Sequence, residues 1–372
     1  MGFYDSTLFL IMATAIETRS FTEAEIDQEA KRLLEKLMHV ECDSRRSWNE
    51  KTCREIAPLT LEINALKKEQ GAIILAHSYV EPEIIYGVAD YSGDSYMLSL
   101  NAKKSQAKKI VFSGVVFMAE TAKILSPEAE VLVPDRNSGC SLADSLTGAQ
   151  LREMKAAYPE AGVVCYINST AEVKAECDAC VTSSNVYKIV AAMPQKQILF
   201  VPDRLMAENI RVEMKKMGVE KEIISSDGTC IVHDTFDPQI IAEARDKFPG
   251  LKVVSHPECT REITSKSDYV GSTGGMMSYV KETEAPYFMM LTECGLVERI
   301  EVESPEKRFI SGCKLCPFMK MNSLKKIRDV LVSPRPDQVV ELDEELRLKA
   351  ERSIERMFEI AEGAPHVPGK GC

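Results

Sequence analysis

A repeat of about 90 residues constrains the fold of this chain more than any other feature of its sequence. From Gly71 onward, short runs rich in Val, Ile and Leu alternate with helix-like stretches, a pattern typical of βαβ units and parallel sheets. Four segments recur in each repeat, and the leading Asp of one of them stands at positions 90, 178 and 268. This period is longer than that of short-repeat solenoids, so each repeat is large enough to form a small domain. The sequence therefore predicts three similar α/β domains.

Each repeat is expected to form an α/β/α sandwich around a short parallel sheet, and the three sandwiches are expected to be related by pseudo-threefold symmetry. The expected ranges are 57–160, 161–250 and 251–335. A helical extension, residues 1–56, precedes the repeats, and a C-terminal helix and tail, residues 336–372, follow them. Chance similarity among α/β sequences is the alternative explanation, and four segments that match at nearly one spacing argue against it.

The last recurring segment of each repeat ends in a cysteine. The segments VLVPDRNSGC, EIISSDGTC and RFISGCKLC end at Cys140, Cys230 and Cys316, which are 90 and 86 residues apart. In open α/β sheets, ligands bind at the carboxyl ends of the strands, where these segments are expected. Domains related by a threefold axis would bring the three thiols to one point. The sequence therefore predicts a central metal site with three cysteine ligands.

Three thiols from three domains suit an iron–sulfur cluster better than a zinc ion. Thiolates favour such clusters, and a cluster held by three cysteines keeps one iron without a protein ligand, which can act as a Lewis acid. A catalytic zinc on the same thiols is the alternative. A structural zinc on Cys177, Cys180, Cys313 and Cys316 is disfavoured, because 132 residues separate the two pairs. Cys313 and Cys316 could instead close a redox-active disulfide.

Short polar stretches stand at equivalent places in the three repeats, where a strand is expected to turn into a helix. They cover residues 94–95, 183–185 and 272–275 and consist of Ser, Thr, Asn, Asp and Gly. Hydroxyl and backbone N–H groups at such turns can cradle phosphate or carboxylate, although helix N-capping is the ordinary role of these residue types. Neither a dinucleotide-binding glycine motif nor a phosphate-binding P-loop occurs, so nucleotide binding is not indicated.

Three of the five histidines are expected at the same sheet edges. His77 and His256 end predicted strands, and His233 follows Cys230 by three residues, which makes them candidates for acid–base chemistry. Tyr79 and Tyr166 stand at matching strand ends, where they could donate hydrogen bonds to a carbonyl or simply pack in the core.

Charge and cysteine content narrow the class of protein. A formal net charge of −11 provides no general basic surface for nucleic acid or anionic lipid. The apolar run Thr7 to Ile16 is ten residues long, too short to span a bilayer, and Asp5 stands where a signal peptide carries positive charge. Twelve cysteines among 372 residues are too few for a disulfide scaffold. We therefore expect a cytoplasmic protein, with Met12 as a hypothetical natural start.

Eight segments between Ala76 and Leu324 resemble the quinolinate synthase family: AHSYVEPEI, ADYSGDS, FMAETAKIL, VPDRNSGCSLAD, GTCIVHD, SHPEC, GSTGGM and CPFMKMNSL. The resemblance implies three similar α/β domains around one [4Fe–4S] cluster, whose open iron acts as a Lewis acid. It also implies that iminoaspartate condenses with dihydroxyacetone phosphate, releasing phosphate and water, to form quinolinate for NAD biosynthesis. Because iminoaspartate is unstable, the resemblance further implies a link to an aspartate-oxidising enzyme.

The same resemblance assigns roles residue by residue. The implied cluster ligands are Cys140, Cys230 and Cys316, and Glu258 and His256 are the implied proton shuttles, with Tyr79 aiding enolisation or ring closure. The remaining implied site residues are His77 and His233 for acid–base chemistry, and Ser95, Tyr166, Asn168, Ser183, Ser272 and Thr273 for substrate binding.

Two positions depart from the family pattern. Many relatives have His-Tyr-Tyr where this chain has His77-Ser78-Tyr79, and some carry three cysteines where this chain has Cys313 and Cys316. If the strand alternates, Ser78 points away from Tyr79, so the first departure should be harmless. The second puts regulation by a disulfide in doubt. Two other hypotheses remain for the same cysteines. The protein could be a zinc-dependent hydrolase or lyase, or a non-catalytic iron–sulfur carrier. The convergent His and Glu residues argue against the carrier, because electron transfer does not need them.

Overall fold

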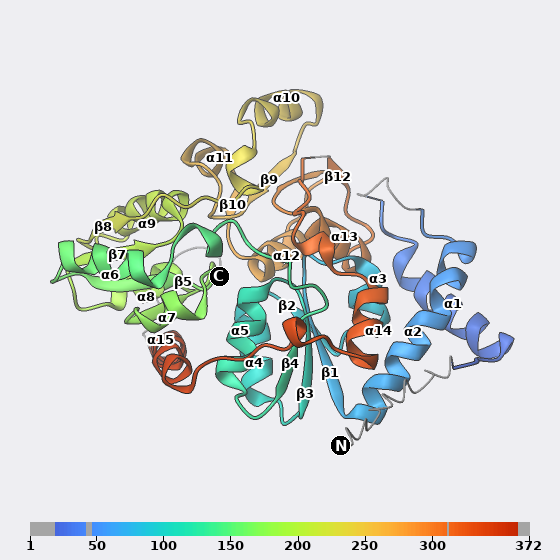
Figure 1. Cartoon of the computed structure of the whole chain (residues 1–372). Coiled ribbons are helices and arrows are strands. Elements are labelled where there is room, and N and C mark those ends of the chain that lie inside the picture. The colour runs from blue at the N-terminus through green and yellow to red at the C-terminus, as the bar shows by residue number, and fades with distance from the viewer. Residues whose placement is uncertain (1–18, 42–46, 311, 364–372) are drawn as a thin grey trace, which may run out of the picture.

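The computed structural model describes residues 19–41, 47–310 and 312–363, and three four-stranded parallel sheets form its framework (Figure 1). The strand orders are β2-β1-β3-β4, β6-β5-β7-β8 and β10-β9-β11-β12, which are the same order three times. This architecture confirms the predicted α/β class. The strand bounds are β1 Ala72–His77, β2 Tyr91–Gly93, β3 Lys109–Ser113, β4 Glu130–Leu132, β5 Gly162–Tyr166, β6 Ala179–Val181, β7 Gln197–Val201, β8 Glu222–Ser225, β9 Lys252–Ser255, β10 Tyr269–Val270, β11 Phe288–Leu291 and β12 Phe309–Ile310.

The aspartate that recurs in the sequence has the same structural task in each unit. The carboxylates of Asp90, Asp178 and Asp268 accept the backbone N–H of Ile74, Val163 and Val253 at 2.7, 2.8 and 2.9 Å. Each aspartate precedes the second strand of its unit, and each donor lies in the first strand, so the bond fixes the start of the parallel pair. Its repetition explains why this position kept its spacing along the chain.

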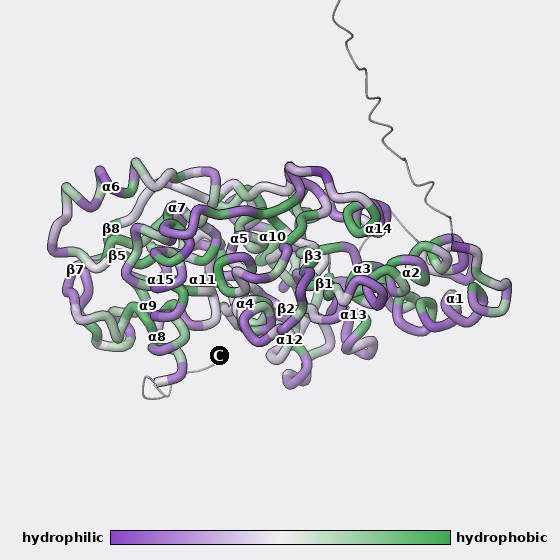
Figure 2. The backbone as a smooth tube through the Cα atoms, turned by 60° about the horizontal axis from the view of Figure 1, so that its bottom comes forward, coloured by the Kyte–Doolittle hydropathy of each residue, from purple (hydrophilic) through white to green (hydrophobic). Residues whose placement is uncertain are grey.

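Helices connect the strands and cover the sheets. In the first unit they are α3 Pro82–Gly87, α4 Ser95–Lys104 and α5 Val116–Leu125. In the second they are α7 Ala171–Ala175, α8 Val186–Ala192 and α9 Arg204–Lys216, and in the third α11 Arg261–Lys266, α12 Thr273–Glu282 and α13 Cys294–Glu303. The strands they flank are predominantly buried, and Figure 2 shows hydrophobic residues gathered at the strands, with hydrophilic residues at outer turns.

After its fourth strand, each unit continues through a cysteine-bearing loop into a short 3₁₀ turn and a helix that packs on the next unit. The turns are η1 Ala143–Ser145, η2 His233–Thr235 and η3 Met319–Met321, and the helices are α6 Gly148–Ala157, α10 Gln239–Lys247 and α14 Leu324–Val332. Leu151 of α6 joins the core of the second sheet, Ile241 of α10 that of the third, and Ile327 of α14 that of the first. This exchange closes the three units into a ring and directs all three loops to their junction.

Helices from both ends of the described chain pack against the first two sheets. Helices α1 Glu23–Leu37 and α2 Glu50–Gln70 pack together, and Ile63 of α2 enters the core of the first sheet. A 3₁₀ turn, η4 Pro336–Gln338, leads to α15 Glu344–Gly363, which packs on the second sheet through Ile354 and Met357. The predictions about Thr7–Ile16 and Met12 fall outside the described residues, and the domain ranges remain predictions. No helix in the described ranges is long and apolar enough to cross a membrane.

A candidate metal and acid–base site at the junction of the three sheets

The three predicted ligand cysteines occupy the same local structure three times. Cys140, Cys230 and Cys316 each stand three residues before a 3₁₀ turn, and each carbonyl accepts the backbone N–H of the fourth following residue at 2.9, 2.9 and 3.1 Å. The same turn directs the backbone N–H groups of the second and third following residues at each sulfur. Such paired N–H groups stabilise a negatively charged sulfur.

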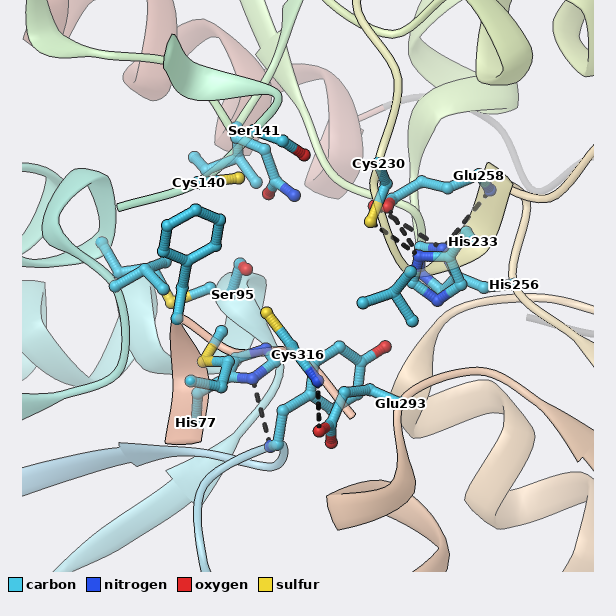
Figure 3. Close-up of a pocket in the computed structure, with 18 of the residues that line it drawn as sticks. His77, Ser95, Cys140, Ser141, Cys230, His233, His256, Glu258, Glu293 and Cys316 are labelled. Carbon is cyan, nitrogen blue, oxygen red and sulfur yellow. Dashed lines mark hydrogen bonds and ion pairs between the residues drawn. The ribbon is translucent and has the colours of Figure 1, made fainter. Parts of the chain in front are cut away.

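The three thiols face one cavity of about 70 Å³, where each arrives from a different unit (Figure 3). All three are free of disulfides. Burial raises the pKa of Cys140 to about 12 and raises those of Cys230 and Cys316, against the opposing effect of their N–H donors. The N–H groups favour a negatively charged sulfur, but burial keeps each free thiol protonated. A positively charged metal centre would remove these protons and bind the three sulfurs as thiolates.

A buried carboxylate stands next to these thiols. Glu258 accepts a hydrogen bond from the Tyr166 hydroxyl at 2.6 Å and lies 2.9 Å from His233 Nδ1. The ring of His256 stacks on that of His233 with centroids 4.7 Å apart (Figure 3). Burial alone would raise the pKa of Glu258, but the two imidazoles and these hydrogen bonds hold it well below its usual range. Glu258 is therefore a buried, ionised base at the wall of this cavity.

His77 and Tyr79 reach the cavity from the carboxyl end of β1. Tyr79 N–H donates to His77 Nδ1 at 3.2 Å, and the two rings meet edge to face at 4.6 Å. Burial, with contributions from Arg299 and His256, lowers the pKa of His77 to about 3. The Tyr79 hydroxyl lies 3.0 Å from Thr292 Oγ1, which lies 3.2 Å from His233 Nε2. One chain of polar contacts thus joins the first unit to Glu258.

Most of the predicted substrate-binding residues line the same cavity, namely Ser95, Tyr166, Asn168, Ser183 and Thr273. Within the part of the chain that the structure describes, Asn168 Oδ1 and Thr273 Oγ1 are buried without a hydrogen-bond partner. Buried polar atoms are nearly always paired, so these two indicate room for a polar ligand. Ser272 is not among the lining residues, and its side chain instead caps α12 by accepting Gly275 N–H at 3.1 Å.

A family model described as quinolinate synthetase A protein matches residues 61–359. The chain belongs to the quinolinate synthase family. It is 42% identical over 318 residues to "Quinolinate synthase" of Caulobacter vibrioides (strain NA1000 / CB15N), covering 84% of each chain. It is 41% identical over 295 residues to "Quinolinate synthase 2" of Mesorhizobium japonicum, covering 79% of this chain and 89% of the relative. The match confirms the resemblance predicted from the eight sequence segments.

In this member of the quinolinate synthase family, the third cysteine loop is held differently from the first. Cys140 N–H donates to Asp144, four residues on, at 3.2 Å. The equivalent position after Cys316 is Lys320, so the acceptor comes from elsewhere: Cys316 N–H donates to Glu293 Oε1 at 3.0 Å (Figure 3). Lys320 Nζ lies 3.6 Å from the same oxygen, and Glu293 is fully buried. No sequence pattern singled out Glu293 and Thr292, although an acidic residue two positions after the apolar run FMML was a usable signal.

We expect Glu293→Ala to lower the free energy of unfolding by about 3 kcal/mol, because it breaks a buried charge pair and removes the acceptor of Cys316 N–H. Urea unfolding of the full chain measures the change. Glu303, an exposed acid at the C-terminal end of α13 paired with Arg299, supplies the matched control: Glu303→Ala should cost about 1 kcal/mol or less. Equal losses in the two variants would show that Glu293 does not hold the loop.

The disulfide between Cys313 and Cys316, which the sequence left open as a possibility, is not formed in this structure. Cys313 is bonded to Cys294, the first residue of α13, and Cys316 is free. The backbone explains the pairing, because Cys294 N–H donates to Lys314 O at 3.1 Å and places Cys294 beside Cys313. A zinc shared with Cys177 and Cys180 is also excluded: Cys313 is oxidised, and the other two lie in the second unit, where Cys180 packs 3.4 Å from Cys165.

Acid should destabilise the fold through its buried histidines. Burial lowers the pKa of His77 and of His256 to about 3, against about 6.5 in the unfolded chain. Between these values the unfolded state binds two more protons, so stability falls as the pH falls. Each histidine contributes about 1.4 kcal/mol per pH unit. Guanidinium unfolding at pH 6 and pH 5 should show a loss of about 3 kcal/mol, and His77→Gln should halve it; a flat profile would contradict these pKa values.

Proposed function

We propose that this chain condenses iminoaspartate with dihydroxyacetone phosphate, releases phosphate and water, and forms quinolinate for NAD biosynthesis in the cytoplasm. One observation supports this most: three free cysteines from three repeated loops line the same cavity as a buried, ionised Glu258. Membership of the family suggests this reaction, and the cavity contains residues that could hold the metal and transfer the protons that the reaction needs.

The three cysteines fit an iron–sulfur cluster. Each sulfur receives two backbone N–H groups, and all three cysteines line one cavity. Cys140, Cys230 and Cys316 would hold a [4Fe–4S] cluster. When bound, such a cluster supplies one iron without a protein ligand, a Lewis acid for loss of water.

The polar residues of the cavity would bind the substrates. Both substrates are anionic, one through carboxylates and the other through phosphate. Thr273 stands in the first turn of α12 and Ser95 in the first turn of α4. Hydroxyl and backbone N–H groups at a helix N-terminus can donate hydrogen bonds to an anion. The unpaired Asn168 Oδ1 would accept a hydrogen bond from a substrate N–H or O–H.

Proton transfers fall to Glu258 and its partners. Loss of water from the condensed chain needs a base for a carbon-bound hydrogen and an acid for the departing hydroxyl. Glu258 is ionised and can accept a proton. Burial and the nearby carboxylate raise the pKa of Tyr166 well above its usual value, so Tyr166 stays protonated and can donate. Because the whole group is buried, bulk water does not compete for these protons.

A second candidate function rests on a specific geometry. Ligand atoms of Cys230, His233 and Glu258 lie within 4.8 Å of one another, a set that suits zinc in a hydrolase or lyase. An activity assay distinguishes the two candidate functions. The full chain is purified anaerobically and supplied with dihydroxyacetone phosphate and with iminoaspartate generated by an aspartate oxidase. The proposal expects quinolinate, detected by chromatography, that disappears after exposure to air and chelator. Activity restored by zinc alone would support the second candidate.

A further inference from the structure

A hollow of about 330 Å³ lies at the seam between the first and third units, and we call it the seam hollow. Ser78 and Asp94 line it from the carboxyl ends of β1 and β2. Lys281 of α12 and Arg299 of α13 line it from the third unit, and Figure 1 shows α12 next to β2. Among the described residues, Asp94 alone borders both this hollow and the cavity of the three cysteines. The seam hollow is therefore a neighbour of that cavity with walls of its own.

Arg299 carries a fixed positive charge at this wall, because a guanidinium stays protonated in proteins. Its Nε donates to Glu303 Oε1 at 2.8 Å, and its Nη1 donates to Ser78 Oγ at 2.8 Å. The Tyr86 hydroxyl also interacts with the guanidinium. A guanidinium has five N–H donors, and these three contacts use at most three of them. At least two donors of Arg299 are therefore left for a ligand.

Ser78 holds the guanidinium from the first unit and adds a donor of its own. Its side chain is 1% exposed, and its oxygen accepts the Arg299 hydrogen bond. A hydroxyl that accepts still has one hydrogen to donate, and within the ranges that the structure describes this hydrogen has no acceptor. Buried polar groups are nearly always paired, so the hydroxyl indicates a ligand acceptor in the seam hollow. One such acceptor group could bind Ser78 and Arg299 together.

The two carboxylates that line the seam hollow are already bound to donors of the protein. Asp94 accepts backbone N–H groups of its own helix α4 and that of Gly274 in α12. Glu303 pairs with Arg299 Nε on α13. Lys281 adds a second positive charge from the exposed surface of α12. The side-chain groups that remain for a ligand are therefore donors, and their complement is an oxyanion.

We propose that the seam hollow binds a phosphate group, held by the guanidinium of Arg299 and the hydroxyl of Ser78, with Lys281 at its rim. The planar fork of a guanidinium matches two oxygens of a phosphate, which a single lysine cannot do. This site is additional to the cavity in which the reaction takes place. Two sources carry the same group, namely the phosphate ester of a substrate and the free phosphate that the reaction releases. The inference rests on the proposed function for these two sources alone.

Calorimetric titration of the full chain with inorganic phosphate tests the site without any need for activity. Ionic strength is held constant with chloride, so that the titration reports phosphate itself. Arg299→Gln removes the charge and the fork, and it should weaken phosphate binding at least about tenfold. Lys281→Gln changes an exposed residue that the fold does not depend on, and it should weaken binding by about threefold. Lys266→Gln, an exposed lysine of α11 that does not line the hollow, is the matched control and should bind phosphate as the parent does.

A further variant separates the seam hollow from the cavity of the three cysteines. The Thr273 hydroxyl faces that cavity and does not line the hollow, so Thr273→Val should leave this phosphate binding unchanged. Binding that Thr273→Val abolishes and Arg299→Gln preserves would place the phosphate in the cavity and overturn the proposal. A parent chain that binds no phosphate at millimolar concentration would overturn it as well.

Kinetics of the anaerobic holoenzyme distinguish the two sources. Phosphate that competes with dihydroxyacetone phosphate, with a KM for that substrate about tenfold higher in Arg299→Gln and little change in kcat, would assign the hollow to the substrate. Inhibition that is not competitive, and that Arg299→Gln relieves, would assign it to the released phosphate. Inhibition and KM that Arg299→Gln leaves unchanged would contradict both sources and overturn the proposal. If the parent enzyme forms no quinolinate, the proposed function fails while the phosphate titration still tests the site.

Discussion

Replacing any one of Cys140, Cys230 and Cys316 by alanine should remove the cluster and reduce quinolinate formation to background. Each loop supplies one sulfur from a different unit, so the loss of one leaves two thiolates, too few for a stable [4Fe–4S] centre. Iron and sulfide analysis of anaerobically purified variants measures the loss. The backbone N–H pairs remain in each variant, so the effect reports the sulfur ligand itself.

Cys177→Ala is the matched control for these variants. Its sulfur donates to Val173 O at 3.0 Å within the second unit and does not line the cavity, so iron content and activity should match the parent. Circular dichroism of the four variants separates loss of the cluster from loss of the fold. A full complement of iron in any of the three ligand variants would show that the assigned ligand set is wrong.

The second large effect is expected for Glu258→Gln. The amide cannot accept a proton, and it replaces an ionised group that His233 and Tyr166 both contact, so kcat should fall roughly 10²- to 10⁴-fold. Iron content should not change, because Glu258 is not an assigned cluster ligand. Steady-state assays at saturating substrate provide the measurement.

Glu262→Gln serves as the control for that variant, since Glu262 is an exposed acid on the adjacent helix α11 and should leave kcat unchanged. A Glu258→Gln enzyme that keeps near-parental kcat would exclude Glu258 as the base. Loss of iron from Glu258→Gln would instead favour the zinc-type arrangement of Cys230, His233 and Glu258.

The repeated elements of this fold were predictable because one physical task recurs at one spacing. The aspartates at 90, 178 and 268 each fix the start of a parallel strand pair, and the cysteines at 140, 230 and 316 each precede the same turn. A structural role that recurs in each unit places the same residue type at a regular spacing in the sequence. That spacing allowed the common strand order and the convergence of the thiols to be predicted.

Features that occur in one unit alone produce no repeated spacing in the sequence, so they could not be predicted in this way. The position of Glu293 corresponds to Asp203 and Val115 in the other units, so the repeat itself hides its role at Cys316. The partner of Cys313 is 19 residues away, and backbone contacts at Lys314 bring it close. Ser272, a turn serine predicted to bind substrate, caps its own helix, which is the alternative role that its residue type also indicated. Contacts that occur in one unit and not in the other two decide such details.

The central claim is that three repeated cysteines hold one cluster, and metal analysis of the full chain tests it most directly. Anaerobic purification or reconstitution should yield a brown protein with about four iron and four sulfide per chain. Chain that binds zinc, with neither iron nor sulfide after reconstitution, would contradict the account.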